Sequence, residues 1–353
     1  QARADWAITV DFAQRLEQRL RPGTPSLFAF DQPQALFDEY KQLTRERDLD
    51  LSGISYAVLD QQGPQQWPFP AGARTGTPRL YGDGIFPTES GRANFIAEPY
   101  RAAKELRDAR FPLTLNTGRL RDQWHGMSRT GTAARLFGHV SEAVLSLHPD
   151  EMRRHRLQAG DLVSLKSRRG SLIVPVSSDD SVRPGQAFLP MHWGDRFLKG
   201  GVNVLTQPAF DPLSKQPELK HTGVRIEAVT LPWQLFALVE SDVQAHLEAL
   251  RPLCENFAYA SLSLAGRERP ALLIRAASTQ APDNQLLTQI DQLLGLNEGP
   301  VLSYDDPRRS IGKRVRIENG RITAIRLAGE TIAQHWLQNL WLEGRADEQL
   351  RRW

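Results

Sequence analysis

The sequence is poor in cysteine, with only Cys254 among its 353 residues. One thiol cannot form an intrachain disulfide, and it cannot supply the several thiolates of a zinc site or an iron–sulfur cluster. The apolar residues Leu253 and Phe257 close to it in sequence indicate a buried structural thiol rather than a nucleophile. The chain by itself therefore carries no cysteine-ligated redox centre.

Long apolar runs and a strong charge of one sign are also missing. No stretch approaches the roughly 20 apolar residues of a membrane span. The net charge is +3, and acidic and basic residues are mixed along the chain. The pairs Arg168-Arg169 and Arg308-Arg309 are far apart and are typical of solvated turns rather than of a nucleic-acid-binding stripe. We therefore expect neither a membrane nor a nucleic acid as a partner.

The composition, with 40% hydrophobic and 24% charged residues, is ordinary for a globular protein, and the length suits two or three domains. The chain starts at Gln1 rather than at a methionine and ends at Trp353 within a charged, amphipathic stretch. Both ends lead us to expect a piece of a longer protein, so the sequence says nothing about an export signal.

The first region, 1–110, is predicted to mix helix and loop. Phe12, Leu16 and Leu20 recur every four residues and predict a helix. Asp31 before Pro33 predicts a second, capped helix over 35–40. From about residue 50 onwards the chain is rich in Gly and Pro, and such long irregular segments are usually functional or wrap another domain.

The middle region, 111–230, is predicted to be rich in short strands, and the last region, 231–353, to be a small α/β domain. Because one short helix interrupts the strands of the middle region without a βαβ repeat, a β-barrel is favoured. The strands are expected at 111–115, 144–147, 161–166, 172–176, 187–190 and 224–229. In the last region we expect a strand at 271–274, an Asn-Gly hairpin over 314–327 and helices around 243–250, 286–294 and 332–340.

The densest polar cluster follows the first predicted strand and contains Thr117-Gly118-Arg119 and then Gln123-Trp124-His125. Gly118 lets backbone N–H groups approach a phosphate, and Arg119 can donate a charge-assisted fork to it. The amide and imidazole can satisfy the polar edge of a fused ring, and the indole offers a packing wall. On these residues alone, the alternative is a polar loop with a capping Thr and one buried Trp.

A second cluster places His192-Trp193 at the end of a predicted strand, with Asn203, Gln216 and Lys220 downstream. Taken singly, each His is more often structural than a ligand, and Asn203 is typical of a turn. Taken together, these side chains suit an extended nucleotide.

Residues 111–229 resemble the molybdopterin-dinucleotide-binding domain of the bis-molybdopterin guanine dinucleotide oxidoreductase family. The matching motifs are residues 116–119, 123–125, the 161–175 hairpin with its Ser-Arg-Arg-Gly turn, 183–185, 192–193, 203–206 and 214–220. The string Ser-Lys-Gln-Pro-Glu-Leu-Lys at 214–220 resembles nitrate reductases within this family. Residues 48–56, 63–68 and 80–93 resemble the assimilatory enzymes, so the chain is similar to the C-terminal portion of their catalytic subunit.

The resemblance implies an α+β, mostly β architecture with a central six-stranded double-psi β-barrel at 111–230. This barrel would bind Mo-bis(molybdopterin guanine dinucleotide), with Lys220 near a pyrophosphate and no catalytic or metal-ligating residue in this chain. The cofactor-binding residues implied are Thr117, Gly118, Arg119, Gln123, Trp124, His125, His192, Trp193, Asn203, Gln216 and Lys220.

The chain departs from the family in its missing cysteines. The resemblance implies [4Fe–4S] and [2Fe–2S] clusters for the full-length protein, but this chain has no ligands for them, and Cys254 lies outside the matched domain. Residues 231–353 resemble, more weakly, the extension before a C-terminal [2Fe–2S] domain. We expect the full-length protein to reduce nitrate to nitrite in the cytoplasm by oxygen-atom transfer, and this chain alone to be inactive. Ferredoxin, flavodoxin and an NADH-dependent reductase all remain open as electron donor.

Two other functions fit the same residues. A different family member, such as a formate dehydrogenase, would share the barrel motifs. A double-psi barrel can also be a non-catalytic binding module. A nitrate-reduction assay on the full-length protein separates the first alternative, and analysis of the purified chain for bound pterin guanine dinucleotide separates the second.

Overall fold

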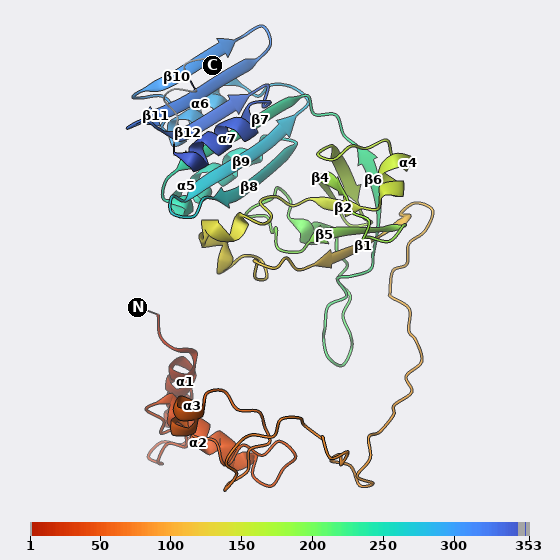
Figure 1. Ribbon diagram of the computed structural model, residues 1–353, viewed down its shortest axis with the longest axis vertical. Coiled ribbons are helices and arrows are strands. Elements are labelled where there is room, and N and C mark those ends of the chain that lie inside the picture. Colours follow the sequence, from red (N-terminus) through yellow and green to blue (C-terminus); the bar gives the residue numbers. More distant parts are fainter. Residues whose placement is uncertain (1, 345–349, 351–353) are drawn as a thin grey trace. The chain divides into compact units, whose positions relative to one another are not determined.

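The computed structural model describes residues 2–344 and 350. The contacts divide the chain into two compact units, Gln1–Tyr100 and Arg101–Trp353. Figure 1 shows helices and irregular chain in the first unit, and two separate β-structures in the second. Across the described residues, every helix is too short or too polar to pass through a membrane.

The first unit contains the helices α1 (Asp5–Leu20), α2 (Pro33–Leu43) and α3 (Tyr56–Gln62). The four-residue apolar spacing correctly predicted α1. The helix α2 is confirmed too, but its predicted cap is wrong, because the N-cap residue is Gln32 and makes no side-chain cap bond. The helix α3 was not predicted, although Ser55 caps it by accepting a hydrogen bond from the Val58 amide at 3.2 Å.

The Gly- and Pro-rich chain after α3 is ordered by close approaches of its backbone. A Cβ atom on Gly76 would lie 2.0 Å from the Gln66 carbonyl oxygen, and one on Gly53 would lie 2.4 Å from that of Pro70. Only glycine fits at such contacts. The side chain of Phe69 packs against Gly53 and is 1% exposed. The irregular segment therefore has a specific fold of its own.

The second unit begins with a closed six-stranded barrel in the order β1-β5-β2-β4-β3-β6. Two pairs, β1 with β5 and β2 with β4, are parallel, and the others are antiparallel, in agreement with the predicted double-psi barrel. The elements are β1 (Leu113–Gly118), η1 (Thr130–Thr132), η2 (Ala134–Phe137), β2 (Leu145–Leu147), α4 (Pro149–Arg154), β3 (Leu162–Lys166), β4 (Ser171–Ser178), β5 (Gln186–Pro190), η3 (Val202–Leu205) and β6 (Thr222–Ala228).

Alternation of apolar side chains builds the barrel core. Leu113 and Leu115 on β1, and Val163 and Leu165 on β3, are all at most 2% exposed, while their intervening neighbours lie nearer to solvent. Successive side chains in a strand point to opposite faces, so each of these strands presents one apolar row to the interior. The same alternation made these strands visible in the sequence.

The turn between β3 and β4 fastens the segment that precedes the barrel. Arg169 forms a paired contact with Glu105, its Nη1 lying 2.6 Å from Oε2, and Arg168 binds both Glu105 and Asp108. The Arg168 guanidinium also lies 4.7 Å from the ring centre of Phe111. These arginines are in a turn, as predicted, but they bind carboxylates of this chain.

The rest of the second unit, here called the C-terminal module, is a six-stranded sheet in the order β10-β11-β12-β7-β9-β8 with three helices. All of its pairings are antiparallel. The elements are β7 (Trp233–Glu240), α5 (Val243–Cys254), β8 (Tyr259–Ala265), β9 (Ala271–Ser278), α6 (Asn284–Leu293), β10 (Val301–Asp306), β11 (Ile311–Glu318), β12 (Arg321–Ala328) and α7 (Gln334–Glu343).

Both faces of this sheet are covered. Leu235 on β7 packs in the core that includes α5 and α6, whereas the next residue, Phe236, packs in a second core with Trp341 of α7. Cys254 at the end of α5 is buried, and burial raises the pKa of its thiol to about 12. The expectation of a structural thiol is therefore confirmed.

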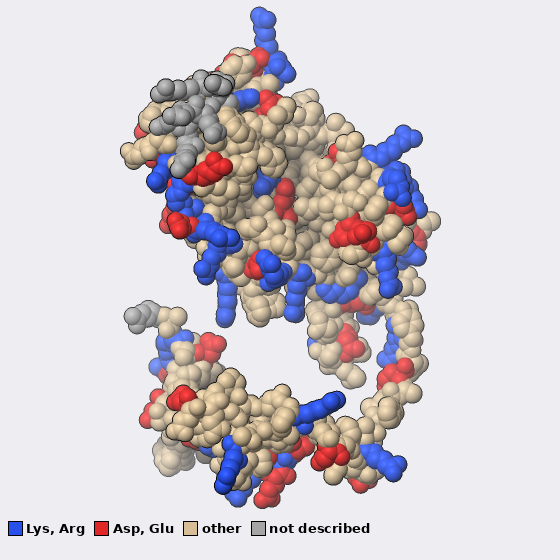
Figure 2. Space-filling model, in the orientation of Figure 1, with Lys and Arg blue, Asp and Glu red and all other residues tan. Residues whose placement is uncertain are grey.

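Charges of both signs are interspersed over the face seen in Figure 2, as the composition indicated. One ion pair is instead buried between α6 and the sheet. Arg326, 3% exposed, donates from Nε and Nη2 to the carboxylate of Asp291, 4% exposed, at 2.8 and 2.6 Å. Arg326 also donates to the Gly312 carbonyl oxygen at 2.9 Å. This bidentate geometry satisfies both charges where water does not reach them.

We predict that replacing Asp291 with Asn destabilises the C-terminal module by about 3–5 kcal/mol, because Arg326 is left buried without its counter-charge. The free energy of unfolding in urea measures this. The matched control is Lys313→Met, which removes the more exposed ion pair with Glu330 and is expected to cost less than about 1 kcal/mol. Equal losses in the two variants would contradict the prediction.

Candidate functional site

Two loops leave the barrel at the same end because β1 and β5 are parallel. Gly118 is paired with Pro190 at the last position of both strands, and the Met191 amide donates to the Gly118 carbonyl oxygen at 2.8 Å. A Cβ atom on Gly118 would lie 2.3 Å from the Phe188 ring, so glycine is required here for packing between the strands. The polar clusters predicted after the two strands therefore lie side by side.

His192 joins the two loops through both nitrogens of its ring. Its Nε2 accepts from the Leu120 amide at 2.9 Å, and its Nδ1 lies 2.5 Å from the His125 carbonyl oxygen. Because an amide only donates and a carbonyl only accepts, the ring is neutral and carries its proton on Nδ1. His192 is fully buried, and this burial lowers its pKa. His192 thus holds the loop rather than facing a ligand directly.

The loop after β1, residues 119–131, is folded back by positive backbone angles. His125 has φ of 42° and Met127 has φ of 61°, values that non-glycine residues rarely adopt. The fully buried Met127 side chain and the bond from the Met127 amide to the Trp124 carbonyl oxygen, at 2.8 Å, anchor the turn. Because the sequence predicts that residues in this loop bind a cofactor, we call residues 119–131 the cofactor loop below.

The tip of the cofactor loop presents two aromatic rings outwards. Trp124 is 53% exposed, His125 is exposed as well, and their rings meet edge to face with centroids 4.5 Å apart. The exposed face of the indole is open to stack on a ligand ring. The alternative of a polar loop with one buried Trp does not describe Trp124, because its ring is exposed. The exposed pair of rings suits contact with a flat heterocycle.

Two cations lie at the end of β1 without a carboxylate partner. Lys220 Nζ donates to the Thr117 carbonyl oxygen, and Thr117 Oγ1 donates to the Leu219 carbonyl oxygen at 2.8 Å. Burial, and then the charge of Arg119, lower the pKa of Lys220. Arg119 is exposed, and the structure records no ion pair for it or for Lys220 among the described residues. The field of this corner favours an anion.

Gln123, in the same loop as Arg119, has a side-chain oxygen without a hydrogen-bond partner among the described residues. It is 8% exposed, and its Nε2 donates to the Leu136 carbonyl oxygen at 3.2 Å. Its Oε1 is buried and has no hydrogen-bond partner in the described chain. Buried polar atoms are nearly always paired, so this oxygen is a candidate to accept a ligand N–H group.

Three predicted residues are not joined to this cluster by any hydrogen bond within the described part of the chain. Trp193 is fully buried in the barrel core and can support the site only from behind. Asn203 is exposed on η3, and Gln216 is exposed in the loop between η3 and β6. Local sequence did not reveal Phe188 or Phe197, which shape the loops from beneath, because their partners are distant in sequence.

Comparisons with known proteins agree with this geometry. Residues 113–223 match the family described as Molydopterin dinucleotide binding domain. The chain is 33% identical over 280 residues to a nitrate reductase of Klebsiella oxytoca, covering 76% of this chain and 31% of the relative. It is 30% identical over 227 residues to the assimilatory nitrate reductase catalytic subunit of Bacillus subtilis (strain 168), covering 64% and 31%. It is also 31% identical over 229 residues to the F420-dependent formate dehydrogenase subunit alpha of Methanocaldococcus jannaschii, covering 65% and 32%.

The chain spans about a third of the length of these curated relatives. The matched domain coincides with the closed barrel, and the two joined loops belong to it. Residues 113–223 therefore match a molybdopterin dinucleotide-binding domain, and the chain is similar to nitrate reductases over the part of their length that it spans.

Proposed function

We propose that the chain is the cofactor-gripping part of a molybdenum nitrate reductase of the assimilatory type. The observation that carries the proposal is the corner formed by Thr117, Arg119 and Lys220, where neither cation has a carboxylate partner among the residues that the structure describes. Phosphate is the anion that such a pair is suited to bind. Nitrate reductases among the relatives, including those of Klebsiella oxytoca and Bacillus subtilis, support nitrate as the substrate of the whole protein.

The residues present fit a pterin guanine dinucleotide. Arg119 and Lys220 would hold its pyrophosphate, and the orphaned Gln123 Oε1 would accept a hydrogen bond from a ring N–H. Trp124 and His125 would flank a ring. When bound, the molybdenum cofactor supplies the two-electron oxygen-atom transfer that converts nitrate to nitrite.

The remaining predicted residues would contribute in other ways. Asn203 and Gln216 are exposed, and their side chains make no hydrogen bond with the described residues, so they would be free to contact the extended nucleotide. Gly118 provides the close strand packing that brings the loops together. His192 and Trp193 would act from beneath by holding the cofactor loop.

The properties of the full-length enzyme belong to the same proposal. It would contain [4Fe–4S] and [2Fe–2S] clusters ligated outside this chain, receive electrons from ferredoxin, flavodoxin or an NADH-dependent reductase, and act in the cytoplasm.

A formate dehydrogenase is the second candidate, since one such relative is 31% identical. Assays of the full-length protein with reduced viologen and nitrate, and with formate and oxidised viologen, decide between them. We expect nitrite production, and formate oxidation without it would overturn the nitrate assignment.

We predict that Arg119→Met weakens retention of the pterin guanine dinucleotide about tenfold, because a charge-assisted hydrogen bond to phosphate is lost. The measurement is molybdenum and released guanine nucleotide per chain after desalting the full-length protein at increasing salt. The matched control is Arg225→Met on β6, where Arg225 lies 3.4 Å from Glu227. Equal cofactor content in both variants would argue against phosphate binding at Arg119.

We predict that acid weakens the hold on the cofactor loop through His192. Burial lowers the pKa of His192 in the folded chain, and Arg119 and His125 are the charged and titratable groups that face it. The unfolded chain takes up this proton near pH 6.5. The stability from the neutral ring is therefore fully present above that pH and is lost as the pH falls towards the lowered folded value.

The measurement is the thermal unfolding midpoint between pH 7.5 and pH 5, compared for the native protein and His192→Gln. The variant should be less stable at neutral pH and should lose less stability on acidification. His139→Gln is the matched control, because His139 is exposed on the segment that follows η2. A native-like pH dependence in His192→Gln would mean that other groups cause it.

A further inference from the structure

The segment that follows His192-Trp193 adds itself to the edge of the C-terminal module. The Lys199 amide donates to the Ala260 carbonyl oxygen at 3.0 Å, and the Leu262 amide donates to that of Phe197 at 2.7 Å. Leu198 and Ser261 form an antiparallel bridge between these bonds. Because β8 is the edge strand of the sheet, a loop of the barrel thus extends the sheet of the module.

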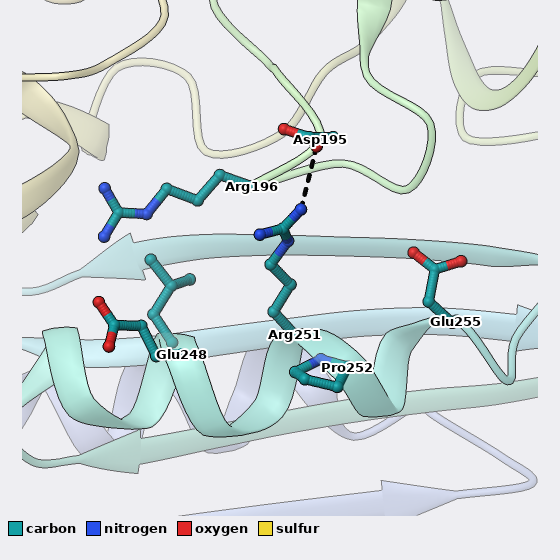
Figure 3. A pocket seen from close by; sticks show the side chains of 7 residues that line it. Asp195, Arg196, Glu248, Arg251, Pro252 and Glu255 are labelled. Atoms are coloured by element: carbon teal, nitrogen blue, oxygen red, sulfur yellow. Dashed lines mark hydrogen bonds and ion pairs between the residues drawn. The ribbon is translucent and has the colours of Figure 1, made fainter.

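Two side chains reinforce this junction. Lys199 Nζ donates to the carbonyl oxygens of Glu255 and Phe257, each at 2.8 Å, and so satisfies carbonyls just after α5. Figure 3 shows Arg251 reaching from α5 to Asp195, with 3.0 Å between Nη2 and Oδ2. The Lys199 contact is better shielded from solvent than the Arg251 contact. The Lys199 side chain is 31% exposed, whereas the Asp195 side chain is 74% exposed.

The same segment supports the cofactor loop at its other end. Phe197 is 1% exposed and lies with its ring centre 6.0 Å from that of Phe137 in η2. A Cβ atom on Gly131 would lie 2.7 Å from the Phe197 ring, so the loop rests directly on this side chain. His192 binds the Leu120 amide and the His125 carbonyl oxygen, as described above. Residues 192–199 therefore contact the cofactor loop and the module together.

A polar cluster makes a second connection between the barrel and the sheet. Tyr259 on β8 donates to Glu142, which follows η2, and burial raises the pKa of Tyr259 so that its hydroxyl stays neutral. Arg275 on β9 donates to Ser263 at 3.2 Å and to Ser141 at 3.4 Å. Its Nε lies 3.7 Å from Glu142. Both connections meet the barrel on the segments that border the cofactor loop.

We propose that the C-terminal module is a positioning element for the cofactor site, and that Lys199 is the side chain that fastens residues 192–199 to it. The module fixes the base on which Gly131 and the Leu120–His125 backbone rest. The role in cofactor retention depends on the proposed function, whereas the mechanical coupling between module and loop does not.

Lys199→Met tests the coupling, because it keeps the apolar stem and removes the two charge-assisted hydrogen bonds. Lys166→Met is the matched control: Lys166 is on β3, is 35% exposed in its side chain, and pairs only with Glu227 at 2.8 Å within the described chain. The measurement is backbone hydrogen–deuterium exchange of the full-length protein, with and without its cofactor. We expect Lys199→Met to speed exchange in residues 119–131 at least about fivefold, with strands β3 and β4 unchanged, and Lys166→Met to leave the loop as it is.

Cofactor content separates the two proposals. If Lys199→Met speeds exchange of residues 258–263 while residues 119–131 exchange as in the native protein, the coupling is overturned and the proposed function is untouched. If the loop responds but the native protein binds no pterin guanine dinucleotide, the coupling stands and the proposed function fails. Should Lys199→Met not fold, Arg251→Gln removes the more exposed contact to Asp195, and a smaller change of exchange at the same loop is then required.

Discussion

The candidate site depends on the parallel pairing of β1 with β5. Because the two strands run in the same direction, the chain leaves both of them at one end of the barrel, and Gly118 lies beside Pro190. An antiparallel pair would have placed Arg119 and His192 at opposite ends. Parallel strands need a long connection, and here that connection contains β2, α4, β3 and β4. The strand pairing that closes the barrel therefore also brings the two loops of the site together.

Charge is treated differently in the two parts of the second unit. In the C-terminal module, Arg326 is matched by Asp291 with two short hydrogen bonds. In the barrel, the one side-chain hydrogen bond of Lys220 to a described residue goes to the Thr117 carbonyl oxygen, and Arg119 lies close enough to lower the pKa of Lys220. Two neighbouring cations repel each other and destabilise a fold unless an anion binds between them. This contrast supports the proposal that a phosphate binds at the barrel corner rather than at the buried ion pair of the module.

The sequence predicted elements whose signal is local, and it missed those whose signal comes from their partners. Strands with one buried face, such as β1 and β3, alternate and were recognised. In contrast, β8 is buried almost throughout, and β10 is a largely exposed edge, so neither alternates clearly. At the site, the order of the motifs was enough to predict that Thr117 and His192 lie at the same end of the barrel. No local pattern could reveal that Lys220 would bind Thr117 from 103 residues away, or that Trp193 would be buried.

The C-terminal module also supports the barrel, because it holds the residues on which the cofactor loop rests. A loop with positive φ at His125 and Met127 is held in an unfavourable backbone conformation, and it needs surroundings that do not give way. Its support, Phe197, is part of a strand added to β8. That sheet is stiffened by a core on each face and by the matched Asp291–Arg326 pair. The rigid module thus supports, through Phe197, a loop with an unfavourable backbone conformation that we propose to bind the cofactor.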